Sequence, residues 1–403
     1  MDKYKWQFTS RFRRHAFGWR SDTPIKRIKE AVLEIKQVAR KEPVLAADGA
    51  IKFLEKLSPA LEQVDSSSGT IGTAVNKAIE TLVPIIVKAD VEVKTRQCWL
   101  DRLWSAFQDD DIPYLESLGD YWDELCATQE LASFWADTLL PCIEQTWCPS
   151  ESGHGFFKGT GVCVASLYAA GRYEELLALI EKAPYKLWHY RQWGVKALTA
   201  MGKKAEAIRY AEDARGCNEP GWLIAQTCEA ILLSSGMHEE AYRRYALEAN
   251  WATTHLATFR AIVKKYPGKS PQDILRDLAA STPGDEGKWF AAAKNAGFFD
   301  MAIELVTHSP TDPRTLIRAA RDYREKQPGF AVKSGLAALR WISLGNGYEI
   351  TAGDVLEAYT AVITASSSAD IPIQHAKKHI RDMVSGSQPN NKFVLAILEH
   401  HLS

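Results

Sequence analysis

The sequence predicts an all-α protein, a right-handed α-solenoid of stacked helix hairpins preceded by a helical N-terminal region. First, a short phrase in which a glycine ends one apolar helix and a second helix starts at once recurs in the middle of the chain. Second, apolar residues recur with helical spacing over nearly the whole length, and the alternation typical of strands is almost absent. Third, the 403 residues suffice for two or three domains or one long solenoid.

The recurring phrase occurs four times within residues 167–306. It reads LYAAGRYEELLALI, LTAMGKKAEAIRYA, LLSSGMHEEAYRRY and AKNAGFFDMAIELV, and its glycines are Gly171, Gly202, Gly236 and Gly297. The first two intervals between these glycines are similar, and the third is nearly twice as long, with Gly268 in the gap. A glycine in this place can end a helix in the left-handed conformation. Positions five, six and nine after each glycine share one helix face, so we expect them to be buried.

The segment GRYEEL at 171–176 resembles the turn between the two helices of a tetratricopeptide repeat. The glycine spacing also agrees with that repeat, whose two-helix period is about 34 residues. The Trp, Leu-Gly and Tyr pattern of its first helix is not kept, and its closing proline appears only in places such as Pro184. The resemblance implies stacked hairpins whose first helices line a concave groove. Through RRHAFGWRS, DSSSGTIGTAV and EGKWFAAAKNAG, the whole chain also resembles a group of uncharacterised bacterial proteins.

Residues 1–40 are basic, with eleven Lys or Arg and four Asp or Glu, an excess of +7. Residues 1–22 interleave these cations with five Trp and Phe rings, which indicates docking rather than disorder. One interpretation is an arm that binds nucleic acid or an acidic partner through Arg13, Arg14 and Trp19. The other is a segment whose rings cap the end of the helix stack while its arginines face water.

The elements that follow are expected to be helices at 24–40, 43–57, 71–89, 92–108, 112–128 and 130–147. The loop DSSSGTIGTAV is expected to be a capped turn, because no lysine follows as in a phosphate-binding P-loop. Residues 91–150 carry three basic and twelve acidic side chains, a local charge of −9. The three aspartates at 109–111 are expected to form a solvated cap for the next helix.

The segment PSESGHGF at 149–156 predicts a domain boundary, because glycines and serines mark a linker or loop. We therefore expect a helical N-terminal region at 1–150, tetratricopeptide-like repeats at 151–310 and helices that cap the stack at 311–403. This last part should end with helices near 352–365, 370–384 and 390–402.

The stretch KAPYKLWHYRQWGVKAL at 182–198 is the richest candidate for binding. It should be the first helix of a repeat, where rings that alternate with cations can hold a peptide carboxylate or an aromatic residue. The candidate contacts are Trp188, Tyr190, Arg191, Trp193 and Lys196. The alternative is that these rings pack between repeats while the charges are solvated.

No catalytic motif is present: the chain lacks GxSxG, HExxH, a GxGxxG after a strand, and GxxxxGK[ST]. His375 and His379 are four residues apart, but the residues between them supply no Glu base. We therefore predict no catalytic residue, metal or cofactor. Seven cysteines without a CxxC motif are typical of reduced thiols in a cytoplasmic protein. No apolar run is long enough to predict a signal peptide or a membrane span.

We expect a cytoplasmic scaffold that binds a protein or peptide in its groove, without membrane contact. A solenoid that binds nucleic acid through the basic N-terminal segment is one alternative, and an unrecognised enzyme with a polar pocket is another. The net charge of −1 identifies no partner, and the sequence leaves the oligomeric state open.

Overall fold

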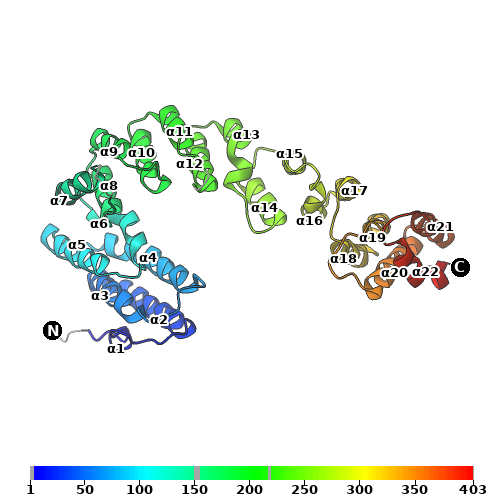
Figure 1. Cartoon of the computed structure of the whole chain (residues 1–403), viewed down its shortest axis with the longest axis horizontal. Coiled ribbons are helices and arrows are strands. Elements are labelled where there is room, and N and C mark those ends of the chain that lie inside the picture. Colours follow the sequence, from blue (N-terminus) through cyan, green and yellow to red (C-terminus); the bar gives the residue numbers. More distant parts are fainter. Residues whose placement is uncertain (1–3, 149–154, 217–218, 403) are drawn as a thin grey trace. The chain divides into compact units, whose positions relative to one another are not determined.

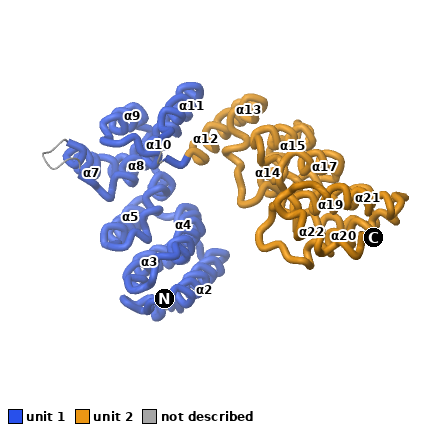
Figure 2. Tube along the Cα trace, turned by 45° about the vertical axis from the view of Figure 1, so that its right-hand side comes forward, with its two compact units in different colours: residues 1–220 blue, residues 221–403 orange. Residues whose placement is uncertain are grey.

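The computed structural model describes residues 4–148, 155–216 and 219–402. All regular structure in these residues is helical. The chain forms two compact units, residues 1–220 and 221–403, which Figure 2 colours separately.

The first unit begins with a group of long helices and continues into short hairpins (Figure 1). Its described helices are α1 (Phe8–Arg11), α2 (Asp22–Ala39), α3 (Pro43–Leu61), α4 (Thr70–Lys88), α5 (Val93–Gln108), η1 (Glu116–Tyr121), α6 (Trp122–Cys126), α7 (Gln129–Trp147), α8 (Thr160–Ala169), α9 (Tyr173–Glu181), α10 (Trp188–Ala200) and α11 (Lys204–Glu212). Helices α2, α3 and α4 pack on one another, and α7 to α10 each pack on the next helix along the chain. Contacts between neighbours in sequence are the pattern of stacked helix hairpins.

The second unit repeats this pattern. Its described helices are α12 (Gly221–Ser234), α13 (His238–Ala249), α14 (His255–Lys265), α15 (Pro271–Ala280), η2 (Glu286–Trp289), α16 (Phe290–Asn295), α17 (Phe299–His308), α18 (Pro313–Tyr323), α19 (Pro328–Ser343), α20 (Ala352–Ser368), α21 (Ile373–Val384) and α22 (Asn391–Leu402). The largest helix contacts join α12 to α13, α18 to α19 and α19 to α20. The three helices predicted at the end of the chain are confirmed as α20, α21 and α22.

The four recurring glycines end their helices as the sequence predicts. Gly171, Gly202, Gly236 and Gly297 have φ angles of 73°, 79°, 74° and 80°. In each case the amide of the following residue donates to the carbonyl oxygen five residues earlier, at 2.9–3.0 Å, and the second helix starts one residue later. These contacts satisfy carbonyls that the helix end would otherwise leave without a donor. Gly268 has no positive φ, although it does lie in the turn between α14 and α15.

The buried face of the repeats is confirmed at two of its three predicted positions. The residues five and nine positions after each glycine are all buried: Leu176, Ala207, Ala241 and Ala302, with Ile180, Ala211, Tyr245 and Val306. At the sixth position Ile208 is buried, and the other three residues are half-buried. The fold is therefore an all-α stack of tetratricopeptide-like hairpins.

The helix predicted at 112–128 is wrong. The chain makes a loop there, followed by η1 and the short helix α6. The cause is Asp110, which is 3% exposed and not solvated as expected. Its carboxylate accepts a hydrogen bond from the Ser58 hydroxyl of α3 and another from the Leu115 amide at 2.7 Å. These contacts hold the loop on α3, and burial raises the pKa of the Asp110 carboxyl although both hydrogen bonds oppose the shift.

The predicted boundary at 149–156 falls largely on residues 149–154, which lie outside the described residues. The helices on either side of it, α7 and α8, pack closely on each other, and the two compact units divide after residue 220. The division of the chain into three parts at residues 150 and 310 therefore stays a prediction.

One described helix, α4, is long and apolar enough to cross a membrane by length and composition. Its residues Ile71, Val75, Ile79, Leu82 and Ile86 are buried, and the helix packs on α2 and α3. Burial in a helical core therefore also accounts for the apolar character of α4.

Candidate functional site

Helix α10 carries five of the binding residues that the sequence suggests. Three of these side chains are buried by packing inside the unit. Trp188, Arg191 and Trp193 are 4%, 3% and 1% exposed. The Arg191 guanidinium carbon lies 3.9 Å from the ring centroid of Tyr210, and its Nη2 donates to Asp213 Oδ2 at 3.1 Å. The expectation that these three side chains line a groove is corrected, because they face neighbouring helices inside the unit.

Tyr190 and Lys196 keep some exposure. Tyr190 is half-buried, and its ring centroid lies 5.8 Å from that of Trp147 at the end of α7. Lys196 is exposed, and its Nζ lies 3.6 Å from the Trp193 ring centroid and 5.8 Å from the Tyr168 ring centroid. Cation–π contacts of this kind hold an ammonium group at an aromatic surface. Lys196 is therefore a fixed cation at the exposed edge of α10.

Two aspartates that sequence reasoning missed belong to the same surface. Asp120 lies near the end of η1 and Asp123 lies in α6, and both are half-buried. The His189 Nδ1 atom lies 3.8 Å from Asp120 Oδ1, and Lys196 acts electrostatically on both carboxylates. We call Asp120, Asp123, Tyr168, His189 and Lys196 the α10 cluster.

Glycines bring three of the four elements of the α10 cluster, η1, α8 and α10, close together. A Cβ at Gly119 would lie 3.5 Å from a Val162 methyl group, so η1 runs directly against α8. A Cβ at Gly161 would lie 3.4 Å from His189 Nε2, so α8 also lies close to α10. Helix α8 packs on η1, α6 and α10. This packing places acidic residues of the 91–150 region beside cations of α10, although the two are far apart in the sequence.

The two aspartates of the α10 cluster are only partly neutralised by the positive charges beside them. Burial raises the pKa of Asp120, while His189 and Lys196 oppose that shift. Burial likewise raises the pKa of Asp123 against Lys196. The Asp120 Oδ1 atom is buried and accepts no hydrogen bond. A buried acceptor without a donor costs free energy, so the cluster favours a group that brings N–H donors or positive charge.

Some side chains of residues 1–22 cap the helix stack, and others stay exposed as a binding arm would require. Trp6, Phe8, Phe12 and Phe17 are buried and pack on one another and on Phe53 of α3. The remaining predicted contacts, Arg13, Arg14 and Trp19, are exposed, and Trp19 is 71% exposed. Arg14 Nε lies 3.6 Å from a Glu62 carboxylate oxygen. Four rings therefore cap the helix stack, while the three predicted side chains face solvent.

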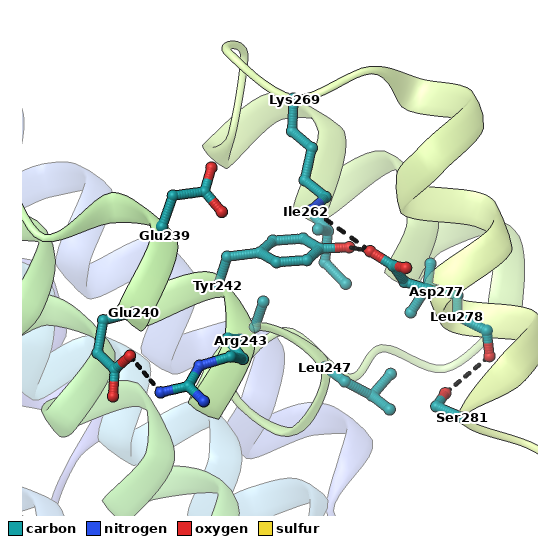
Figure 3. A pocket seen from close by; sticks show the side chains of 11 residues that line it. Glu239, Glu240, Tyr242, Arg243, Leu247, Ile262, Lys269, Asp277, Leu278 and Ser281 are labelled. Carbon is teal, nitrogen blue, oxygen red and sulfur yellow. Dashed lines mark hydrogen bonds and ion pairs between the residues drawn. The ribbon is translucent and has the colours of Figure 1, made fainter.

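A cleft of about 480 Å³ between α13 and α15 was not predicted (Figure 3). The Tyr242 hydroxyl lies 2.8 Å from Asp277 Oδ2, and the Lys269 Nζ lies 4.1 Å from the Tyr242 ring centroid. Apolar side chains such as Leu247 and Ile262 complete the wall. One sequence signal was available, because Tyr242 occupies the sixth position after its glycine, where the other copies have Leu or Ile.

The described residues hold no group of three His, Cys, Asp or Glu side chains that could bind a metal ion. Six of the seven cysteines lie in the described residues, and these six are not in disulfides. A cytoplasmic location and a bacterial origin stay predictions.

No protein-family model matches the chain. A stretch of 122 residues, 30% of the chain, is 29% identical to a phosphoenolpyruvate carboxykinase [GTP] of Chlamydia muridarum, and it spans 19% of that enzyme. The crystal structure of the APC/C hetero-tetramer Cut9-Hcn1 is similar over 92% of this chain and 76% of that chain, at 13% identity and a TM-score of 0.21. Neither likeness assigns an activity. The capped hairpins themselves define the class, a helical-repeat protein of the tetratricopeptide-like kind.

Proposed function

We propose that this protein is a scaffold that binds a protein or peptide, and that the α10 cluster contacts a positively charged segment of the partner. The observation that carries the proposal is the buried Asp120 Oδ1 atom without a hydrogen-bond donor, next to the second carboxylate of Asp123. Buried polar atoms in folded proteins are nearly always paired, and a bound partner would supply the missing donor.

The charges around the α10 cluster favour a cationic segment. Glu116 acts electrostatically on Asp120 and Glu124 acts on Asp123, so the region carries four carboxylates against one lysine and one histidine. A Lys or Arg side chain of a peptide would donate to the aspartates, and its aliphatic stem would lie against Tyr168. Because η1, α6, α8 and α10 pack in succession, an extended peptide can run across their shared face.

Selection from a random peptide display library tests this proposal. The full-length protein should enrich peptides that contain Lys or Arg, and the Asp120→Asn/Asp123→Asn variant should bind them about tenfold or more weakly, since charged hydrogen bonds contribute about 1.5–3 kcal/mol each. The control is Asp90→Asn/Asp111→Asn, which changes two exposed aspartates elsewhere in the first unit. Equal binding by both variants would exclude the α10 cluster, and no enrichment over an unrelated helical protein would exclude the scaffold.

A further inference from the structure

Helix α2 has a row of basic residues on its solvent face. Lys26, Lys29, Lys36 and Arg40 are spaced by three, seven and four residues, which places them on one side of the helix. All four are exposed, and none takes part in an ion pair within the described residues. Leu33 lies in the same row and is also exposed. We call these four cations the α2 stripe.

The two glutamates nearest to the α2 stripe are used elsewhere, whereas Asp22, exposed in the first turn of α2, lies in the row itself, four residues before Lys26. Glu30 accepts from Arg11 at 2.8 Å and from Arg27 at 2.7 Å, while Lys26 acts on it only at longer range. Glu34 accepts from the backbone amides of Gln7 and Phe8, at 2.9 and 3.4 Å. Both glutamates therefore hold the N-terminal segment on α2, and the stripe stays positive, with four cations against the single carboxylate of Asp22 in the same row.

The dimensions of the stripe fit a polyanion. Fourteen residues separate Lys26 from Arg40, an axial distance of about 21 Å in a helix that rises about 1.5 Å per residue. Phosphates recur about every 3.4 Å along the axis of a strand stacked as in a helix, and farther apart in an extended strand, so the stripe spans at most about six of them. Trp19 and Arg20, both exposed, lie immediately before the first turn of α2. An exposed indole can stack on an unpaired base, which a duplex does not offer.

We propose that the α2 stripe binds the phosphate backbone of a single-stranded nucleic acid, with Trp19 stacking on a base. This inference goes beyond the protein-binding function and does not rest on the α10 cluster. Affinity then comes mainly from the release of counterions by four cations, and sequence preference is weak.

Fluorescence anisotropy with a labelled 20-nucleotide RNA of mixed sequence tests the proposal on the full-length chain. For four phosphate contacts, the logarithm of the affinity should fall against the logarithm of salt concentration with a slope of about −3. Lys26→Glu/Lys29→Glu/Lys36→Glu/Arg40→Glu should weaken binding about tenfold or more and flatten this slope. Trp19→Ala should weaken binding of the RNA and leave the slope unchanged, because stacking releases no counterions.

The matched control carries the same change in net charge at four other exposed cations: Lys203→Glu/Arg209→Glu/Lys264→Glu/Lys326→Glu. It should bind RNA like the natural protein. Equal loss in both quadruple variants would overturn the proposal, since net charge alone would then explain binding. A 20-base-pair duplex that binds as well as the single strand would also contradict it, as would binding to phosphatidylserine vesicles without binding to RNA. Replacing the four stripe residues with Gln, and checking the helical circular dichroism, separates loss of binding from loss of folding.

Discussion

Lys265, at the end of α14, contacts the fully buried carboxylate of Glu229 in α12, with Nζ 2.5 Å from Oε2. The other carboxylate oxygen accepts from the Tyr266 hydroxyl at 2.6 Å and from Asn250 Nδ2 at 2.8 Å. A buried carboxylate with this many donors ties α12, the end of α13 and α14 together inside the second unit. Burial and Glu229 both raise the pKa of Tyr266, so its hydroxyl stays protonated and donates.

Glu229→Ala should therefore destabilise the protein by about 3–5 kcal/mol, because Lys265 would lose its charged partner and the buried Tyr266 hydroxyl would be left without an acceptor. Urea unfolding of the full-length chain measures this difference. The control Glu239→Ala removes an exposed carboxylate in α13 and should change stability by less than about 0.5 kcal/mol. A loss below about 1 kcal/mol for Glu229→Ala would show that the buried network contributes little.

Gly49→Ala tests how firmly the N-terminal segment is docked. A Cβ at Gly49 in α3 would overlap the Trp6 ring, so we expect a loss of about 1–3 kcal/mol. At Gly72 in α4 no atom lies within 4 Å of the added Cβ, and Gly72→Ala should stabilise the protein by about 0.5–1 kcal/mol. Thermal melting compares the two variants. Equal melting temperatures would mean that Trp6 does not pack on Gly49.

Asp354 gives a pH-dependent contribution to stability. It forms the capping box of α20 with Thr351 and accepts from Arg314 Nε at 3.0 Å, and Arg314 is the main cause that lowers the pKa of Asp354 to about 2. A carboxyl group whose pKa is lower in the folded state stabilises the fold at pH values above its unfolded pKa of about 3.9. This stabilisation is lost as the pH falls through about 2.

Asp354→Asn should therefore cost about 1–2 kcal/mol near pH 6, because it weakens the charge-assisted hydrogen bonds that the carboxylate accepts from Arg314 and from the Thr351 amide. The difference from the natural protein should shrink between about pH 4 and pH 2. Urea midpoints over this range measure it, with Asp300→Asn in the first turn of α17 as the control. If the stability difference between Asp354→Asn and the natural protein grew as the pH fell, the lowered pKa of Asp354 would be contradicted.

The cysteines should divide into two classes by reactivity. Burial raises the pKa of the Cys126 and Cys163 thiols to about 12, whereas Cys98, Cys142 and Cys148 are exposed. Since the thiolate is the reactive form, iodoacetamide at pH 8 should label the three exposed cysteines in the folded protein, and the buried Cys126, Cys163 and Cys228 only after unfolding. Peptide mapping by mass spectrometry reads each site. Rapid labelling of Cys126 in the folded protein would contradict its placement.

The sequence was a reliable guide where local chemistry decides structure. The glycine caps and the buried positions five and nine residues after them follow from backbone rules and helical periodicity. The helix predicted at 112–128 failed because Asp110 binds Ser58, 52 residues away, and no local pattern shows that contact.

The candidate site was harder to predict. Alternating rings and cations on α10 suggested an exposed groove, but Tyr210 of α11 and Asp213 at the end of that helix cover Arg191. Asp120 and Asp123 were overlooked because only the packing of α8 between η1 and α10 brings them to Lys196. Surfaces built from several repeats depend on which side chains the neighbouring helices cover, and one repeat alone does not show this.

Site-specific photo-crosslinking in cells tests the central claim most directly. A photoreactive amino acid at Ala200, an exposed position one turn beyond Lys196, leaves the α10 cluster intact, and Arg209 in α11 serves as the comparison position. The account predicts one defined protein adduct at position 200 that is absent at position 209 and is lost with Asp120→Asn/Asp123→Asn. The same adducts at both positions, or an adduct at position 200 that survives the double substitution, would contradict it.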